Sequence, residues 1–451
     1  MIAGVAAGHP ATAAAGIEVL EDGGTAADAA VAACLASCVA ESVMTGFLGG
    51  GHAIWWDGRD ARLLDCFVTV PERQEPLVPL PVPFGEEVVH YAVGSASCAV
   101  PGLPAGLDSL WRAGGRLPWR RLVEPALRLA REGVPLPPAH ASCLAMLAPV
   151  LTLGHGADIF APGGSLLGSG DVLEQPGLVG AFELVAEEGA GSVYRGSLAA
   201  SLLGIDGVVV TAAELETYEP AWSAPVEVAR DGTTILTRGG LSRVPETLLR
   251  LPRLGGLDPA ARAVALVTTL AGTNGPDGHT TNLVAVDRDG RACVLTTSLG
   301  IGSGDFLPGL DLHLNSMLGE VDLVHEPLVG SERMASMMAP TLAFDGDGLS
   351  LAIGAAGGTR LRTAHVGVLA GILDEGLEPE AAVERPRLHP AGEVVHAEPG
   401  VDEAALTRLE HDGVVVRRWA ERHHYFGGVS LVGRRGLAGD SRRSGAALRV
   451  T

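Results

Sequence analysis

The pattern of hydrophobic and polar positions predicts helices and strands along most of the 451-residue chain. An Ala-rich stretch at 9–24 ends in Gly-Gly, and Thr25 then begins a second apolar stretch that runs to about Ala40. Both are typical of helices, because Gly often closes a helix and Thr is a favoured N-cap residue. Two more stretches, 103–115 and 119–133, have amphipathic helical spacing and are expected to cover a sheet.

Residues 134–265 carry weaker signals. Helices are predicted at 178–187, 197–203 and 211–218, and strands at 225–228 and 233–236. No internal repeat, low-complexity tract or linker divides the chain. We therefore expect one large domain rather than several.

The most informative pattern lies at 272–299. Residues 272–279 hold three Gly, an Asn, a Pro and an Asp, which predicts an exposed, mobile loop. The pattern changes at Thr280, where a β-rich run to 286, an Asp-Gly turn and a second run at 292–299 predict a hairpin. A threonine thus stands where a loop enters the first strand of a hairpin.

A cut before Thr280 would place a hydroxyl nucleophile and a free α-amine on the same residue. The amine, with a reference pKa near ~7.7–8.0, supplies the general base that the hydroxyl needs. No separate His or Asp is then required. The hairpin alone is equally consistent with an ordinary surface hairpin that has a Thr-rich strand.

Composition excludes several functions. The formal net charge of −21 argues against a nucleic-acid partner, and the absence of lysine excludes a P-loop or Schiff-base lysine. The six cysteines show no metal-binding spacing, and Cys34 and Cys38 are expected to fill a core. His423-His424 has no third ligand at usable spacing, so we expect neither metal nor cofactor. We find no secretory signal and no membrane span, and expect a cytoplasmic protein.

Several motifs occur together in a recognisable order. They are an HP…GG-x-A…DAA…GGG signature at 9–51, an AVPG…LPW run from Ala99, the hairpin sequence H-T-T…V-x-D-x-D-G…T-T-S-L, and LAIGAAGGTR at 351–360. This order resembles the gamma-glutamyltransferase (gamma-glutamyltranspeptidase) family of N-terminal-nucleophile (Ntn) hydrolases. Such proteins cleave their own precursor before a threonine.

The resemblance implies an α+β fold, a four-layer αββα sandwich. It also implies autocleavage of a zymogen between His279 and Thr280. The resulting segments, 1–279 and 280–451, would together form one domain and stay associated as an αβ heterodimer, which could itself pair. The expected partner is a small-molecule substrate.

The resemblance also assigns site residues. Thr280 would be the nucleophile, Ser298 a supporting hydroxyl, and Gly357 with Gly358 the oxyanion hole. The implied substrate-binding positions are Thr296, Asn315, Glu320, Ser336 and two positions that depart from the family pattern. Phe67 stands where the family carries a carboxylate-binding Arg, and Met337 replaces the second of two serines.

Three functions remain open. The first is a gamma-glutamyl hydrolase or transferase. The second is a relative with another substrate, recruited into secondary metabolism as an acylase or carbon–carbon bond hydrolase, which Phe67 and Met337 favour. The third is an unprocessed, non-catalytic binding protein, against which the intact Thr280 and the two glycines argue.

Overall fold

The computed structural model describes residues 1–84, 87–271, 280–321, 323–324 and 327–451. The predicted loop at 272–279, with His279 of the predicted cleavage site, lies outside the described residues. The helices are α1 (Pro10–Glu21), α2 (Ala26–Ala40), α3 (Leu103–Gly114), α4 (Trp119–Glu132), α5 (Pro138–Leu151), α6 (Gly156–Phe160), α7 (Gly177–Glu188), α8 (Ser197–Leu203), α9 (Ala212–Thr217), α10 (Val244–Arg250), α11 (Pro259–Leu270), α12 (Arg360–Leu373), α13 (Pro379–Glu384) and α14 (Glu403–His411). The strands are β1 (Gly4–Ala7), β2 (Gly50–Trp56), β3 (Ala61–Cys66), β4 (Val78–Phe84), β5 (Glu87–Val93), β6 (Val134–Pro135), β7 (Val172–Leu173), β8 (Ala221–Ser223), β9 (Val226–Arg230), β10 (Thr233–Thr237), β11 (Thr281–Val286), β12 (Ala292–Ser298), β13 (Thr341–Asp345), β14 (Gly348–Ala356), β15 (Leu388–Ala391), β16 (Val394–Ala397), β17 (Val415–Arg418), β18 (Gly428–Gly433), β19 (Leu437–Gly439) and β20 (Ala446–Arg449).

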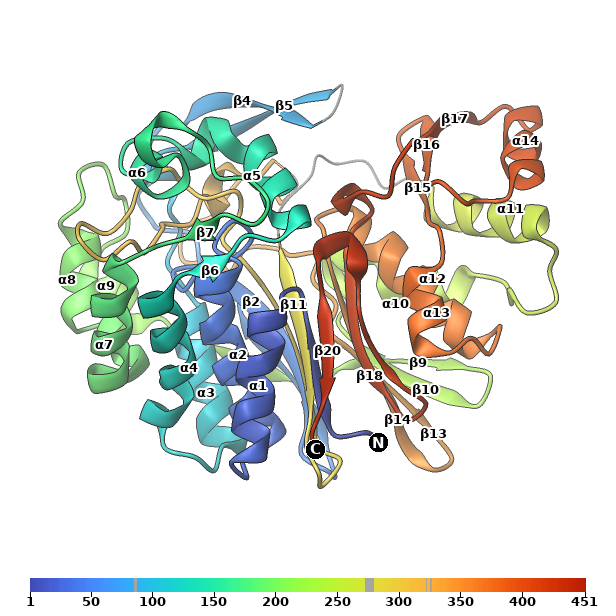
Figure 1. The fold of residues 1–451 in the computed structure, drawn as a ribbon, viewed down its shortest axis with the longest axis horizontal. Helices are drawn as coiled ribbons and strands as arrows, with labels where there is room; N and C mark the ends of the chain where they lie inside the picture. Colours follow the sequence, from blue (N-terminus) through green and yellow to red (C-terminus); the bar gives the residue numbers. More distant parts are fainter. Residues whose placement is uncertain (85–86, 272–279, 322, 325–326) are drawn as a thin grey trace.

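Two stacked antiparallel sheets form the centre of the molecule (Figure 1). The first has the strand order β20-β1-β11-β12-β2-β3-β8, and the second has the order β19-β18-β14-β13-β10-β9. Helices α1, α2 and α3 pack on the outer side of the first sheet, with α4 and α7 behind them, and α10, α12 and α13 cover the second. The predicted αββα sandwich is confirmed.

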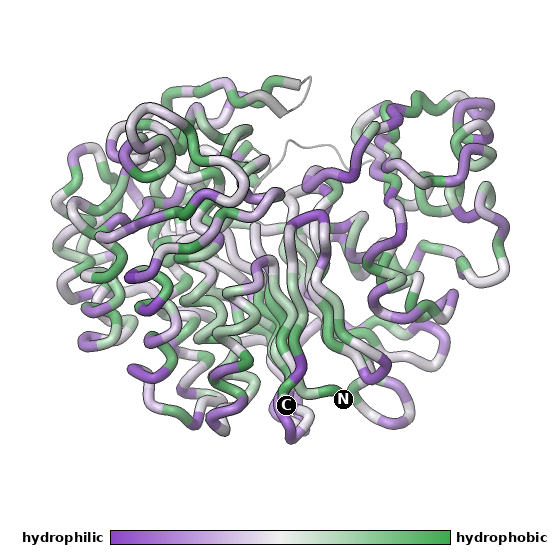
Figure 2. Tube along the Cα trace, viewed as in Figure 1, coloured by the Kyte–Doolittle hydropathy of each residue, from purple (hydrophilic) through white to green (hydrophobic). Residues whose placement is uncertain are grey.

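The alternation along β11 shows how the sequence builds these layers. Leu283 and Ala285 belong to the hydrophobic cluster between the first sheet and its helices. Val284 and Val286 belong to the cluster between the two sheets. Both faces of the strand are buried, so it has no polar side, and Figure 2 shows the hydrophobic residues gathered along the central strands.

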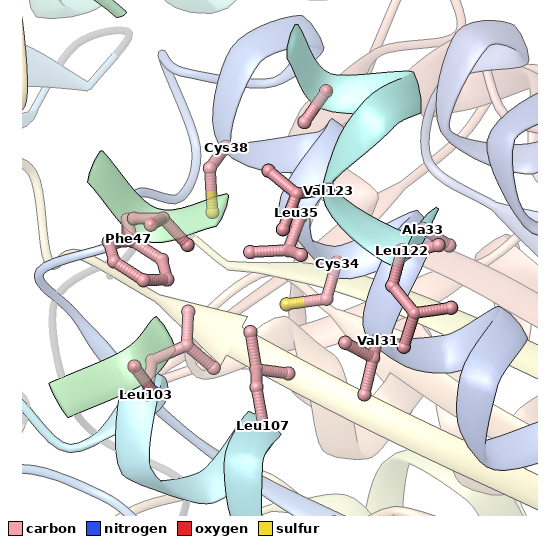
Figure 3. Close-up of a cluster of buried hydrophobic side chains, with 14 of the residues drawn as sticks. Val31, Ala33, Cys34, Leu35, Cys38, Phe47, Leu103, Leu107, Leu122 and Val123 are labelled. Atoms are coloured by element: carbon pink, nitrogen blue, oxygen red, sulfur yellow. The ribbon is translucent and has the colours of Figure 1, made fainter. Parts of the chain in front are cut away.

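The predicted amino-terminal helices form. Thr25 caps α2, as expected, in a reciprocal capping box with Asp28, and His9 caps α1, which was not predicted. Helix α2 is buried along its whole length, and its Cys34 and Cys38 point into the cluster that includes Phe47, Leu103 and Leu107 (Figure 3). The two thiols fill the core, as predicted.

Sequence reasoning missed several elements. These are helices α5, α10 and α11, the β4–β5 hairpin, and a small unit made of the β15-β16-β17 sheet and α14. The small unit packs on α11 at the edge of the second helical layer (Figure 1). Among the described helices, none is long and apolar enough to cross a membrane.

Candidate active site

Thr280 lies at the start of β11, an interior strand of the first sheet. The β11–β12 register pairs Thr281 with Thr297, so one residue further Thr280 lies opposite Ser298. The Thr280 side chain is 7% exposed. Its Oγ1 accepts a hydrogen bond of 2.6 Å from the Gly357 N–H, and its carbonyl oxygen accepts one of 3.2 Å from Arg443 Nη1. Hydrogen bonds therefore hold both the side-chain hydroxyl and the backbone carbonyl group of Thr280 in place.

The Gly357-Gly358 turn carries the donor to Thr280. Strand β14 ends at Ala356, and α12 begins at Arg360. The φ angles of the two glycines are 129° and 55°, in the region that favours glycine, and a Cβ on Gly357 would lie 2.9 Å from the Gly427 Cα. A backbone N–H fixed by such a turn is the type of donor that stabilises a developing oxyanion.

Ser298 is the last residue of β12, and its Oγ accepts a 3.0 Å hydrogen bond from the Gly300 N–H. The backbone of Gly49 packs against it so closely that a Cβ there would lie 2.1 Å from the Ser298 carbonyl oxygen. The glycine cluster before β2 brings its backbone close to another group. That group is the end of the strand opposite Thr280.

A pocket of about 30 Å³ opens beside Thr280. Most of its wall is apolar, and the polar side chains in it are Thr280, Ser298, Glu320 and Ser336. The apolar side chains are Phe67, Met317, Leu323, Met337, Met338 and Leu361, and Gly300 and Gly358 complete the lining. No arginine is among these lining residues, all of which belong to the described part of the chain.

Glu320 is the acid in this pocket, and it is 1% exposed. Its Oε1 accepts hydrogen bonds of 2.8 Å from the Ile301 N–H and 2.9 Å from Ser316 Oγ. Burial raises the pKa of Glu320 to about 7, against the lowering effect of these two donors. Near neutral pH this carboxyl group is therefore present in both protonation states.

Phe67 forms an apolar wall of the pocket. Its ring is buried and stacks on His52, with centroids 5.5 Å apart. Burial, with the charges of Arg238 and Arg333, holds the pKa of His52 well below its usual range. His52 is therefore neutral, and neither of the two stacked rings brings a positive charge to the pocket.

The loop with Ser336 and Met337 forms the opposite part of the lining. Ser336 Oγ accepts a 3.2 Å hydrogen bond from the Met338 N–H, and its carbonyl oxygen accepts one of 2.8 Å from Arg238 Nη1. The Met337 side chain is partly exposed. The loop therefore presents one hydroxyl and two thioethers to the pocket.

Comparison with known proteins settles the family. A family model described as gamma-glutamyltranspeptidase matches residues 12–255 and 258–450. The chain belongs to the gamma-glutamyltranspeptidase family. The predicted family and enzyme class, an Ntn hydrolase or transferase, are confirmed, and nothing favours a non-catalytic member.

Relatives of this family member carry two kinds of name. This chain is 25% identical over 498 residues to a glutathione hydrolase proenzyme of Bacillus subtilis, and the match covers 91% of this chain and 84% of that protein. This chain is 26% identical over 487 residues to the acylase ACY 1 proenzyme of Pseudomonas sp. strain V22, and the match covers 90% of this chain and 85% of that protein. The cephalosporin acylase from Bacillus halodurans has the same fold, with a TM-score of 0.84, 23% identity, and coverage of 99% of this chain and 96% of that one.

Two of the predicted site residues lie elsewhere in this family member. Thr296 points between the sheets, where its Oγ1 accepts a 2.8 Å hydrogen bond from Asn282 Nδ2. The buried Asn315 side chain bonds the backbone of Ala99 and Leu48 at 2.9 Å. Neither residue lines the pocket beside Thr280. Their positions suit a role in holding strands and loops together better than contact with substrate.

Sequence reasoning missed two buried polar side chains, which contact Thr280 and Thr281. Arg443, which donates a hydrogen bond to the Thr280 carbonyl oxygen, is buried. Glu41 directly follows α2 and accepts hydrogen bonds from Thr12 at 2.7 Å and from Thr281. Burial raises the pKa of Glu41 to about 7, although both hydroxyls and the Arg443 charge act in the opposite direction. The only sequence signal for Glu41 is an acid at the end of an otherwise apolar helix.

No group of three or more His, Cys, Asp and Glu side chains in the described ranges could hold a metal ion.

Proposed function

We propose that this protein is an autoprocessed threonine-nucleophile acylase whose substrate has an apolar acyl group rather than a gamma-glutamyl group. The observation that carries the proposal is the lining of the pocket beside Thr280, which is mostly apolar, has one acid and, among the described residues, no cation. The acylase names of two relatives support the same reading.

Maturation would begin with attack of Thr280 Oγ on the carbonyl carbon of residue 279. The C–N bond then breaks, the acyl group moves to Oγ as an ester, and the Thr280 nitrogen takes up a proton to become a free amine. Water hydrolyses the ester and leaves a carboxylate on residue 279. The products are the segments 1–279 and 280–451, which together keep one domain.

Turnover would reuse the same oxygen. The Thr280 amine accepts the Oγ proton as Oγ attacks the substrate acyl carbon, and the leaving amine departs with a proton. Water then releases the acid from the acyl-enzyme. The N–H groups of Gly357 and Gly358 are suited to stabilise the oxyanion of each tetrahedral intermediate, because the Gly357 N–H lies 2.6 Å from Thr280 Oγ1, which becomes bonded to the same carbon as the oxyanion.

The lining argues against a gamma-glutamyl substrate on energetic grounds. An α-carboxylate needs charge-assisted hydrogen bonds, each worth about 1.5–3 kcal/mol. Phe67 and Met337 remove two such contacts, which amounts to roughly two to four orders of magnitude in kcat/KM. Glu320 would instead bind a hydrogen-bonding group of the substrate. The unbranched side chains of Met337 and Met338 can rearrange to admit an apolar chain into a space that is small in the intact protein.

Cleavage is tested by mass spectrometry and terminal sequencing of the purified protein. We expect two fragments, the second beginning at Thr280. Thr280→Ala should remain a single chain, whereas Thr280→Ser, which keeps a hydroxyl, should still be cut. A different first residue, or cleavage of Thr280→Ala, would overturn the assignment of the nucleophile.

Specificity is tested by comparing gamma-glutamyl p-nitroanilide with hexanoyl p-nitroanilide, which have the same leaving group. We expect kcat/KM to be higher for the hexanoyl compound by about two orders of magnitude or more. Equal or better turnover of the gamma-glutamyl compound would show that another cation binds the carboxylate and that the substrate assignment is wrong.

The same proposal includes a cytoplasmic location and a small molecule as the only substrate partner. The six cysteines support a reducing compartment, because all are free and buried. Cell fractionation with an antibody to the native protein checks the location.

A further inference from the structure

A second and larger cavity, of about 290 Å³, lies between the helices of the second layer and the small unit of β15–β17 and α14. It shares no lining residue with the pocket beside Thr280. Helices α11 and α12 form its inner walls, and the exposed residues Leu257, Pro259 and Asp402 lie at its mouth. Figure 1 shows α11, α12 and α14 around this part of the molecule.

The apolar lining comes from two separate hydrophobic clusters. Leu266, Leu270 and Val368 belong to the cluster that packs against the second sheet. Ala263 and Leu388 belong to the cluster inside the small unit. The cavity is the place where these two clusters meet without filling the space between them, so an apolar ligand could extend both.

Two guanidinium groups share one carboxylate on the wall of this cavity. Arg262 Nε lies 3.1 Å and Arg385 Nη1 lies 2.5 Å from Glu375 Oε1, and the three side chains are 14–27% exposed. Burial, and then the charge of Arg385, lowers the pKa of Arg262. Two guanidinium groups share a single carboxylate, so this cluster has an excess of one positive charge.

Both arginines also keep donors in reserve. The hydrogen bonds of Arg262 within the described ranges are all made by Nε, and those of Arg385 by Nη1, so each retains at least one terminal nitrogen for a ligand. Arg387, which also lines the cavity, is already bound by Asp440 and by backbone carbonyls. Asp402, at the mouth, caps α14 by accepting from the Ala405 N–H at 2.9 Å.

We propose that this cavity is a binding site for a small amphipathic acid, with its carboxylate on Arg262 and Arg385 and its apolar body between the two hydrophobic clusters. A guanidinium pair is suited to a carboxylate, because the planar N–H groups can donate two parallel hydrogen bonds. A cationic amphiphile of the same length would face two like charges. A neutral amphiphile would give the N–H donors of Arg262 and Arg385 no anionic partner.

The test uses the whole purified protein and three probes of equal chain length, which are octanoate, octan-1-ol and octylammonium. Isothermal titration calorimetry should show that octanoate binds at least about tenfold more tightly than octan-1-ol, and octylammonium should not bind. Octanoate should also raise the thermal midpoint, since it binds the folded state. Equal binding of octanoate and octan-1-ol would overturn the proposal without the need for any variant.

Charge variants should act with opposite signs. Arg262→Gln should weaken octanoate binding about tenfold, whereas Glu375→Gln should strengthen it, because it frees both guanidinium groups. Ala263→Leu should block the cavity and abolish binding. The matched control is Arg112→Gln, which breaks an exposed Arg–Asp pair of 2.7 Å on α3 and should change nothing. Octanoate affinity unchanged in both Arg262→Gln and Ala263→Leu would show that the acid binds elsewhere.

Discussion

At the scale of single residues, Phe67 has a backbone that is fixed independently of its side chain. Its carbonyl oxygen accepts hydrogen bonds of 2.7 Å from Tyr218 and 2.8 Å from Arg333, so the main chain is anchored independently of the ring. The ring itself contacts the neutral His52. The apolar character of this wall therefore depends on the ring and not on the course of the backbone.

We expect Phe67→Arg to raise kcat/KM for gamma-glutamyl p-nitroanilide about tenfold or more, because a guanidinium at this wall restores a charge-assisted contact. The variant should also lose stability, since the new charge is buried near Arg238 and Arg333. Phe67→Leu, which keeps the wall apolar, should leave gamma-glutamyl turnover low. An equal rise in both variants would mean that the loss of the ring, rather than the gain of charge, is responsible.

The raised pKa of Glu41 predicts a pH-dependent stability. Between about pH 4.5 and pH 7 the folded protein keeps a proton on Glu41 that the unfolded chain has released, so rising pH destabilises the fold through this group. Glu41→Gln does not titrate. The free energy of unfolding of the variant relative to wild type should therefore increase by about 2–4 kcal/mol from pH 4.5 to pH 7.5, at roughly 1.4 kcal/mol per pKa unit.

Urea titrations at four pH values measure this difference, and the pair at pH 4.5, where both side chains are neutral, is the internal control. A difference that stays constant with pH would show that Glu41 titrates normally in the folded protein.

At the scale of elements, the start of the β2–β12 pairing depends on Gly49, the residue before β2. Its carbonyl oxygen accepts hydrogen bonds of 3.0 Å from the N–H groups of Gly102 and Leu103, and a Cβ on it would strike the Ser298 carbonyl. We expect Gly49→Ala to cost about 1–3 kcal/mol in stability and to slow self-cleavage about a hundredfold, because the end of β12 must move away from Thr280.

Pulse expression followed by denaturing gels gives the rate of cleavage in this variant. Gly367→Ala is the matched control, since its Cβ would meet nothing within 4 Å and it lies inside α12. The control should mature at the wild-type rate and be slightly more stable. Equal rates in the two variants would contradict the role assigned to Gly49.

The elements that could be predicted are those whose local signals agree with their final environment. The β11–β12 hairpin has two β-rich, mostly apolar runs joined by an Asp-Gly turn, and α2 has a capping box, so both were found with nearly their final bounds. The β15–β17 sheet was missed because its strands have only four residues each and mix His or Arg with apolar positions. Their burial comes from packing on α11, which no local pattern reveals.

Like the fold, the candidate site was predictable only in part. The positions of Thr280, Gly357 and Gly358 follow from a strand start and a glycine turn, which are visible in the sequence. The contacts of Glu41 and Arg443 with this strand join residues that lie hundreds of positions apart in the sequence. Such contacts depend on the stacking of the layers rather than on any spacing along the chain.

At the scale of the whole molecule, the predicted cut would leave two interleaved chains. In the first sheet, β1 of segment 1–279 lies between β11 and β20 of segment 280–451. In the second sheet, β10 from the first segment pairs with β13 from the second. The cluster between the sheets also draws on both segments, with Ile54 from one and Val294 from the other.

We therefore expect the cleaved protein to remain one particle of 46.1 kDa, or a multiple of it, in 1 M NaCl. At this ionic strength exposed ion pairs are screened within about 3 Å, whereas the buried apolar contacts and the shared strand ladders persist. Size-exclusion chromatography with denaturing gels of each fraction makes the measurement. The 279-residue fragment and the fragment of 172 residues (451 − 279) should co-elute, at the volume of uncut Thr280→Ala. Elution of the two fragments in separate fractions would show that the layers are held together by charge rather than by their common core.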